Sequence, residues 1–148
     1  MHSAPDQDSQ ITSYQKTLVQ TSFQMVVPIT QDAAAMFYQR LFLLDPALTR
    51  LFPGDMKEQG RRLMQMIALA VRGLDRLDTL VAVVEELGRR HADYGVRPEH
   101  YESVGAALLW TLEQVLGAGF TTEVREAWTV VYGVLSASMR KGAALTAA

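Results

Sequence analysis

The sequence predicts an all-α domain with six long helices and one short irregular corner. Apolar residues recur at helical spacing almost throughout the 148 residues, and short segments with Pro, Gly or Asp separate the periodic stretches. At about 150 residues per domain, this length corresponds to one domain. A chain of this size buries roughly 70% of its unfolded surface, so its core needs neither a disulfide nor a structural metal.

Start and stop signals place the helices along the chain. Asp45-Pro46 ends the second helix, because proline disfavours helical backbone in the residue before it. Asp55 and Glu58 resemble a capping box for the third helix, and Pro98 suits the first turn of the fifth. The expected helices span about residues 10–27, 30–44, 55–74, 78–93, 98–116 and 121–140, with the irregular corner at 47–54. We expect one folded domain over residues 10–141, between a flexible tail at 1–9 and a frayed tail at 142–148.

Composition excludes several classes of function. The 16 acidic and 14 basic residues give a net charge of −2, which disfavours nucleic acid as a partner. The absence of cysteine excludes disulfides, thiolate metal sites, a cysteine nucleophile and thioether-linked haem. The polar first ten residues do not form a secretory signal, and charged or amide residues interrupt every apolar run below the ~18 residues needed to cross a bilayer. We therefore expect a soluble cytoplasmic protein that does not insert into membranes.

Two predicted helices carry a polar residue on an apolar face. Residues at offsets of 0, 4, 7 and 11 share one helix face to within about 40°. One such face holds Gln59, Leu63, Met66 and Ala70, and another holds Leu80, Val84, Leu87 and His91. An unpaired buried polar group costs about 1–3 kcal/mol, so His91 needs a partner if it is buried.

Two interpretations of His91 remain open from the pattern alone. Either it makes an ordinary hydrogen bond in the core or lies exposed near a frayed helix end, or its neutral nitrogen binds a metal. No second histidine lies at a spacing of three or four residues, so a zinc site made by the protein alone is hard to build. A metal held in its own macrocycle needs only one axial imidazole.

Seven short motifs follow one another between about residues 10 and 140. They are Phe37-Tyr38-x-x-Leu41-Phe42, Asp45-Pro46, Leu51-Phe52-Pro53, Gln59 ahead of Leu63-Met64, Leu87-Gly88-Arg89-Arg90-His91-x-x-Tyr94-Gly95-Val96, His100-Tyr101-x-x-Val104-Gly105 and Ala127-Trp128-x-x-x-Tyr132-Gly133. In this order and with this spacing, the sequence resembles the globin family, and in detail the single-domain bacterial haemoglobins related to flavohaemoglobins. The resemblance implies a globin fold with a haem pocket between the helices.

The resemblance also implies roles for individual residues around a non-covalently held haem b. His91 would be the proximal ligand of the haem iron. Helix geometry adds the expected acceptor for its other nitrogen, which is the carbonyl four residues back, that of Leu87. Tyr38 and Gln59 would be the distal pair facing a bound gas. The remaining implied haem contacts are Phe52 packing on the porphyrin, Leu63 as an apolar wall, and Leu87, Val96 and Tyr101 on the proximal side.

The resemblance leaves several functions open. The first is reversible, high-affinity binding of O2, with NO and CO as further ligands. The second is a nitric oxide dioxygenase, which needs electrons from a reductase. Because 148 residues leave no room for a reductase domain, an external flavin or NADH reductase would supply them. A gas sensor and a haemless interaction domain are further alternatives. The flavohaemoglobin branch has a glutamate where this chain has Ala143, which argues against peroxidase-like chemistry. We expect a monomer or a weak homo-oligomer.

Overall fold

The computed structural model describes residues 11–147 and the side chains up to Ala144, so the expected tail at 1–9 lies outside the described residues. All of the regular structure in this range is helical, as the sequence predicts. The six longer helices are α2 (Ser13–Val26), α3 (Thr30–Leu44), α4 (Met56–Gly73), α5 (Leu77–Asp93), α6 (His100–Leu116) and α7 (Thr122–Ala147). Short 3-10 turns join them, namely η1 (Val27–Ile29), η2 (Pro46–Leu51), η3 (Leu74–Arg76) and η4 (Gly117–Gly119).

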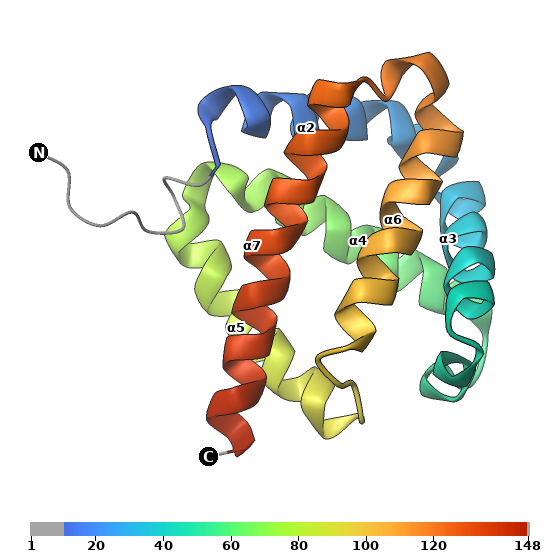
Figure 1. The fold of residues 1–148 in the computed structure, drawn as a ribbon, viewed down its shortest axis with the longest axis vertical. Helices are drawn as coiled ribbons and strands as arrows, with labels where there is room; N and C mark the ends of the chain where they lie inside the picture. Colours follow the sequence, from blue (N-terminus) through green and yellow to red (C-terminus); the bar gives the residue numbers. More distant parts are fainter. Residues whose placement is uncertain (1–10, 148) are drawn as a thin grey trace, which may run out of the picture.

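The helices pack as two groups around a shared core. Helix α3 packs against α6 and α4, whereas α7 crosses α5 and also contacts α2 (Figure 1). One buried cluster centres on Val19, Leu74 and Trp128, and a smaller one centres on Phe37, Tyr38 and Leu41 of α3. Leu63 and Leu108 contact both clusters, which makes them the link between the two halves of the core.

The helix starts follow from local hydrogen bonds. Thr12 and Gln15 form a reciprocal capping box at the start of α2, with both contacts at 3.0 Å. At the start of α4, the Asp55 carboxylate accepts from the Lys57 backbone N–H at 2.9 Å. The capping box expected there is only half formed, because Glu58 pairs with arginines one turn further along the helix instead of reaching back to Asp55.

The fifth predicted helix starts later than the sequence indicates. Helix α6 begins at His100, because the backbone N–H groups of His100 and Tyr101 close a preceding turn on the carbonyls of Arg97 and Pro98. Gly95, with φ of 99°, ends the chain reversal after α5, a conformation that glycine adopts without steric cost. This compact corner brings the end of α5 close to the start of α6.

The structure differs from the expectation for the C-terminus. The sequence predicts a frayed tail from residue 142, but α7 continues as helix to Ala147. Gly142 is buried, and a Cβ placed on it would lie 1.9 Å from the carbonyl oxygen of Glu85 in α5. A glycine near the end of a helical pattern predicts the end of the helix. In the structure, the missing side chain of Gly142 instead lets the last turns of α7 pack on α5.

The buried face of α4 also differs from the predicted one. Met64 and Val71 are buried, whereas Met66 is 40% exposed. A Cβ on Gly60 would lie 2.9 Å from the Cβ of Ala34, so α4 approaches α3 most closely at Gly60. This close approach turns the Gly60, Met64 and Val71 face inward and leaves Gln59 and Leu63 half-buried at its border.

A buried polar contact joins α2 and α7 within the larger cluster. The Trp128 indole N–H donates to the Ser22 hydroxyl at 2.9 Å, and that hydroxyl donates to the Leu18 carbonyl at 2.7 Å. Every polar atom of this pair therefore has a partner, which a buried Trp N–H requires.

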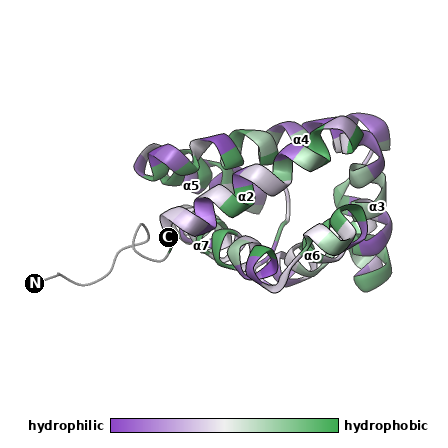
Figure 2. Ribbon diagram, turned by 90° about the horizontal axis from the view of Figure 1, so that it is seen from above, coloured by the Kyte–Doolittle hydropathy of each residue, from purple (hydrophilic) through white to green (hydrophobic). Residues whose placement is uncertain are grey.

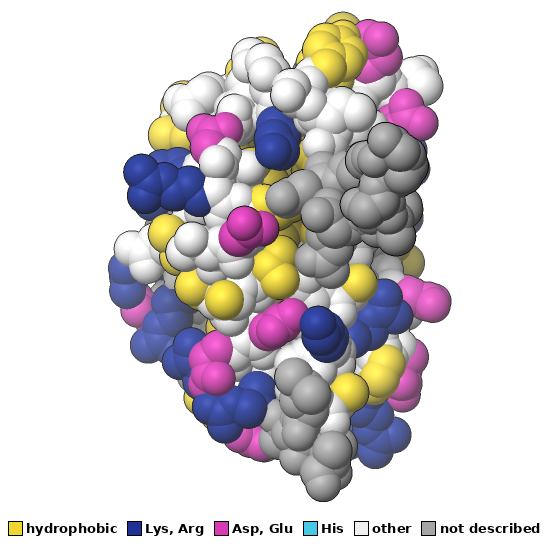
Figure 3. Space-filling view, turned by 90° about the vertical axis from the view of Figure 1, so that its left-hand side faces the viewer, with side chains coloured by type: hydrophobic (Ala, Val, Ile, Leu, Met, Phe, Trp, Pro, Cys, Tyr) yellow, Lys and Arg dark blue, Asp and Glu magenta, His cyan; other side chains and the backbone are white. Residues whose placement is uncertain are grey.

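Charged residues lie on the outer faces of the helices. Hydrophilic and hydrophobic residues alternate along each helix in Figure 2, as expected of amphipathic helices around a core. On the face shown in Figure 3, acidic and basic side chains are interspersed with single apolar ones. Within the described residues, no helix has both the length and the apolar character needed to span a bilayer.

Candidate functional site

His91 lies in the last turn of α5 and is held by its own helix. Its Nδ1 is 2.9 Å from the Leu87 carbonyl oxygen, one turn earlier. A carbonyl can only accept, so Nδ1 carries the proton and Nε2 keeps its lone pair. This is the acceptor that the sequence predicts. The described residues offer Nε2 no hydrogen-bond partner, which leaves it available as a metal ligand.

The surroundings of His91 favour its neutral form. Burial lowers the pKa of the imidazole, the bond to the Leu87 carbonyl opposes this, and the charge of Arg90 lowers the pKa further. A neutral imidazole is the form that binds metals. The side chain is therefore prepared as a ligand at neutral pH without a carboxylate beside it.

A cluster of aromatic rings surrounds Tyr38 on α3. The Phe52 ring, just after η2, meets the Tyr38 ring edge to face with centroids 5.1 Å apart. Phe37 makes a similar T-shaped contact at 5.1 Å, and Phe42 stacks on Tyr38 at 5.9 Å. The structure thus brings together the predicted site residues Tyr38 and Phe52, and Leu63 packs against the same cluster.

The Tyr38 hydroxyl is buried and only weakly bonded. It donates to the backbone carbonyl of Gln59 at 3.4 Å, which is long for an O–H···O bond. Burial raises the pKa of Tyr38 to about 12, so the hydroxyl keeps its proton at neutral pH. A stronger acceptor placed nearby would therefore compete well for this donor.

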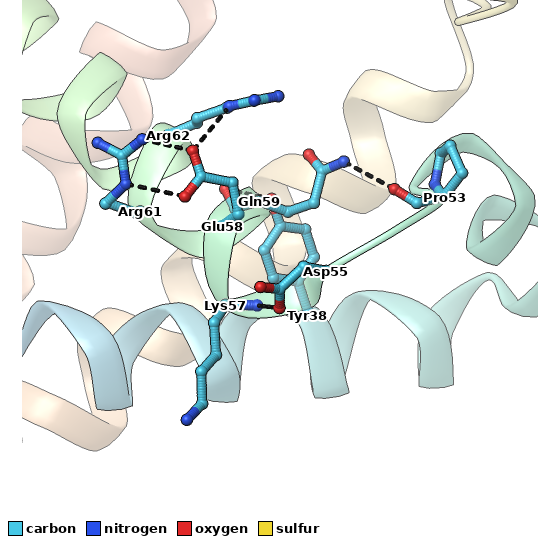
Figure 4. Close-up of polar contacts among 8 residues, drawn as sticks. All are labelled: Tyr38, Pro53, Asp55, Lys57, Glu58, Gln59, Arg61 and Arg62. Carbon is cyan, nitrogen blue, oxygen red and sulfur yellow. Dashed lines mark hydrogen bonds and ion pairs between the residues drawn. The ribbon is translucent and has the colours of Figure 1, made fainter.

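Gln59 is adjacent to Tyr38, but its side chain points elsewhere. Figure 4 shows the Gln59 amide directed toward Pro53, where Nε2 donates to the carbonyl oxygen at 3.2 Å. Tyr38 approaches Gln59 from the backbone side of α4. The two expected distal residues are thus neighbours, with Tyr38 facing the interior and the Gln59 amide tied to the corner after η2.

The end of α5 contacts the same corner. A Cβ on Gly95 would lie 3.6 Å from Leu51 Cδ2, next to Phe52. Val96 is half-buried, and its backbone N–H donates to the His91 carbonyl at 3.0 Å. The corner that carries Phe52 and the segment that follows His91 therefore lie close together at Gly95 and Leu51.

Tyr101 lies in the first turn of α6 and is buried. The Tyr132 hydroxyl on α7 donates to the Tyr101 carbonyl at 2.6 Å, which ties α6 to α7. Burial raises the pKa of Tyr101, and the positive charge of Arg140 opposes this. This chain has Ala143 where the flavohaemoglobin pattern has a glutamate. The charged group that acts on Tyr101 is the Arg140 cation.

An apolar cavity of about 20 Å³ lies beside the aromatic cluster. Phe37, Leu63 and Leu108 line it on the side of the cluster, and Phe23 and Trp128 line it on the other. At this volume it is too small to hold a haem.

The residues present fit a haem. His91 offers one neutral nitrogen ligand, and Phe52 offers an aromatic ring, both next to the α5–η2 contact. Among the described residues, no group of three or more His, Asp or Glu side chains gathers to hold a bare metal ion. A single imidazole with apolar and aromatic neighbours matches a metal that arrives in a macrocycle.

Sequence reasoning missed some contacts in this region. Phe42 and Tyr132 belong to quoted motifs, yet helical periodicity did not indicate their roles in stacking on Tyr38 and in bonding Tyr101. The Pro53 carbonyl that holds the Gln59 amide carries no sequence signal, because any residue has a carbonyl.

Comparison with known proteins identifies the class. The globin family model matches residues 35–139. A neuroglobin of Tetraodon nigroviridis is 32% identical over 146 residues, covering 89% of this chain and 92% of that protein. A flavohemoprotein of Vibrio cholerae is 37% identical over 117 residues, and one of Bacillus subtilis is 32% identical over 117 residues. Each match covers 74% of this chain, which spans only about 30% of the length of these flavohemoproteins.

The fold agrees with these sequence relatives. A crystal structure of a hexacoordinated heme protein from an anhydrobiotic tardigrade superposes with a TM-score of 0.85 at 18% identity, covering 95% of this chain and 99% of that one. The all-α architecture of the described residues is that of a globin-like protein. The chain belongs to the globin family.

The lowered pKa of His91 predicts a pH effect on the protein without haem. The unfolded state, with a His pKa near ~6.5, takes up a proton before the folded state does, so the free energy of unfolding falls as the pH drops through and below that value. Replacing His91 by Leu removes this contribution, and we expect a smaller loss of stability between about pH 7 and about pH 5. Urea unfolding of both proteins across this range measures the difference. Equal losses in the two proteins would mean that His91 titrates normally.

Proposed function

We propose that this globin holds haem b through His91 and binds O2 reversibly and tightly, with Tyr38 and Gln59 on the distal side. The observation that carries the proposal is the His91 imidazole, whose Nδ1 is fixed on the Leu87 carbonyl and whose Nε2 is neutral and without a partner in the described chain. Haem supplies the iron on which a diatomic gas binds. The absence of cysteine supports a non-covalent haem, because a thioether cannot form.

As the proposed iron ligand, His91 would be oriented and tuned by its own helix. Its bond to Leu87 O fixes the tautomer and the plane of the ring, and such outer contacts raise the basicity of a ligand histidine. A neutral backbone carbonyl raises it less than a carboxylate would. This supports gas binding rather than peroxide cleavage, in agreement with Ala143 at the position of the glutamate in the flavohaemoglobin pattern.

Tyr38 stabilises a polar gas by hydrogen bonding. Its hydroxyl stays protonated and is committed only to a long contact with Gln59 O, so it can donate to an O2 ligand, which is polarised when bound. A hydrogen bond to a charged acceptor contributes about 1.5–3 kcal/mol. At about 1.4 kcal/mol per tenfold, this slows O2 release roughly 10- to 100-fold.

Gln59 would join Tyr38 on the distal side when its amide exchanges its hydrogen bond to Pro53 for one to the gas. In the structure its amide donates to Pro53 O at 3.2 Å, a contact at the protein surface that costs little to give up. Rotation of the side chain would turn the amide toward the same space as the Tyr38 hydroxyl. Leu63, one turn further along α4, then provides the apolar wall.

Replacing Tyr38 by Phe tests this arrangement. The substitution keeps the ring contacts with Phe52 and removes the donor, so we expect the O2 dissociation rate to rise more than about fivefold. The CO dissociation rate should change less, because bound CO is less polar. Stopped-flow displacement of O2 by CO measures the first rate.

Tyr14 provides the matched control for this substitution. It is 56% exposed at the start of α2, and its hydroxyl donates to Glu123 far from the site. Tyr14→Phe should leave the O2 dissociation rate unchanged. An unchanged rate in Tyr38→Phe as well would remove Tyr38 from the distal side.

A nitric oxide dioxygenase is the second candidate, favoured by the flavohemoprotein relatives. In that reaction NO and O2 take up one electron and form nitrate, so each turnover needs an electron from a reductase. Rapid mixing of the O2-loaded protein with NO, followed by a steady-state assay with NADH and a flavin reductase, separates the two functions. We expect one equivalent of nitrate without sustained turnover for a carrier, whereas continuous nitrate formation would establish the enzyme.

A further inference from the structure

Helices α5 and α7 touch backbone to backbone at two glycines. A Cβ placed on Gly88 of α5 would lie 1.9 Å from the carbonyl oxygen of Met139 in α7. Reciprocally, a Cβ on Gly142 of α7 would lie 1.9 Å from the carbonyl oxygen of Glu85 in α5. Packed non-bonded atoms normally stay about 3.5–4.0 Å apart, so neither position accepts any side chain at this helix separation.

We infer that Gly88 and Gly142 are positioning residues for His91, because they set how far α5 lies from α7. This inference rests on the proposed role of His91 as the haem ligand. Gly88 is the residue after Leu87, whose carbonyl orients the imidazole, and it lies less than one helical turn before His91. A shift of α5 at Gly88 therefore moves the ligand and its orienting carbonyl together.

The side-chain contacts next to these two glycines are weaker or more adaptable. The ion pair between Lys141 and Glu85 spans 3.6 Å, but the Lys141 side chain is 66% exposed, and such pairs contribute little. The Met139 side chain is only partly buried, and the atoms that meet Gly88 belong to the Met139 backbone. A backbone contact cannot move aside as a rotating side chain can, so an added methyl group must displace a helix.

The displacement would reach the bond between His91 and the iron. The methyl carbon that Gly88→Ala adds would lie more than about 1.5 Å closer to the Met139 carbonyl oxygen than a normal contact allows. Ligand groups must be held within about 0.5 Å of their working position. Gly88→Ala should therefore strain or lengthen the bond from His91 Nε2 to the iron, and Gly142→Ala, which acts further from His91, should do so less.

Gly133→Ala is the matched control on α7. Gly133 is exposed in the middle of the helix, and nothing lies within 4 Å of a Cβ placed there. The same change of side chain therefore adds helix propensity without touching α5. Making Gly88→Ala and Gly142→Ala in the Gly133→Ala background also offsets part of any loss of folding stability.

The readouts are the iron–histidine stretching band of the ferrous protein by resonance Raman and the rate of haem loss to an acceptor globin. We expect a shifted band and about 10- to 100-fold faster haem loss in Gly88→Ala, a smaller effect in Gly142→Ala and none in Gly133→Ala. An unshifted band in both contact variants would overturn the inference. A wild-type protein that takes up no haem would instead contradict the proposed function.

Rescue by free imidazole separates positioning from a general packing defect. In a His91→Gly background, added imidazole can serve as the axial ligand without a link to α5. We expect Gly88→Ala to have no further effect on the iron–imidazole band or on haem loss in this background. If Gly88→Ala has an effect of the same size in the wild-type and His91→Gly backgrounds, Gly88 acts on the pocket as a whole and not through His91. If Gly88→Ala does not fold, the same comparison is made with Gly142→Ala.

Discussion

The hydrogen bond from His91 Nδ1 to the Leu87 carbonyl is the interaction on which the site depends. It needs only one intact turn at the end of α5, because a residue and the carbonyl four positions earlier lie on the same side of a helix. It fixes the tautomer, and burial keeps the imidazole neutral. The proposed ligand is thus prepared by a backbone carbonyl and by burial, without a carboxylate beside it.

The proposed distal side also has few polar groups. Tyr38 is packed among aromatic rings that restrict its position, and burial keeps its hydroxyl protonated. The nearest acceptor is a carbonyl at 3.4 Å, a weak contact that leaves the donor available. A single well-placed hydroxyl in an apolar setting discriminates a polar gas from a less polar one.

Much of the fold and part of the site could be predicted from sequence, for identifiable reasons. Helix spacing and the Pro and Gly boundaries located the six helices, and the four-residue offset gave Leu87 as the partner of His91. The Gln59 amide could not be placed, because its orientation depends on a carbonyl in a separate corner. The packing role of Gly142 could not be predicted from sequence for a related reason. A glycine that ends a helix and one that lets two helices meet look the same in sequence, and only the position of α5 distinguishes them.

His91 is the residue expected to make this globin a haem protein. The most direct measurement is an absorption titration of the purified protein with haemin, followed by reduction with dithionite, for the wild type and for His91→Ala. The account predicts a Soret band that saturates at one haem per chain in the wild type and is lost in His91→Ala. A wild-type protein that stays colourless, or a His91→Ala variant with an unchanged Soret band, would contradict it.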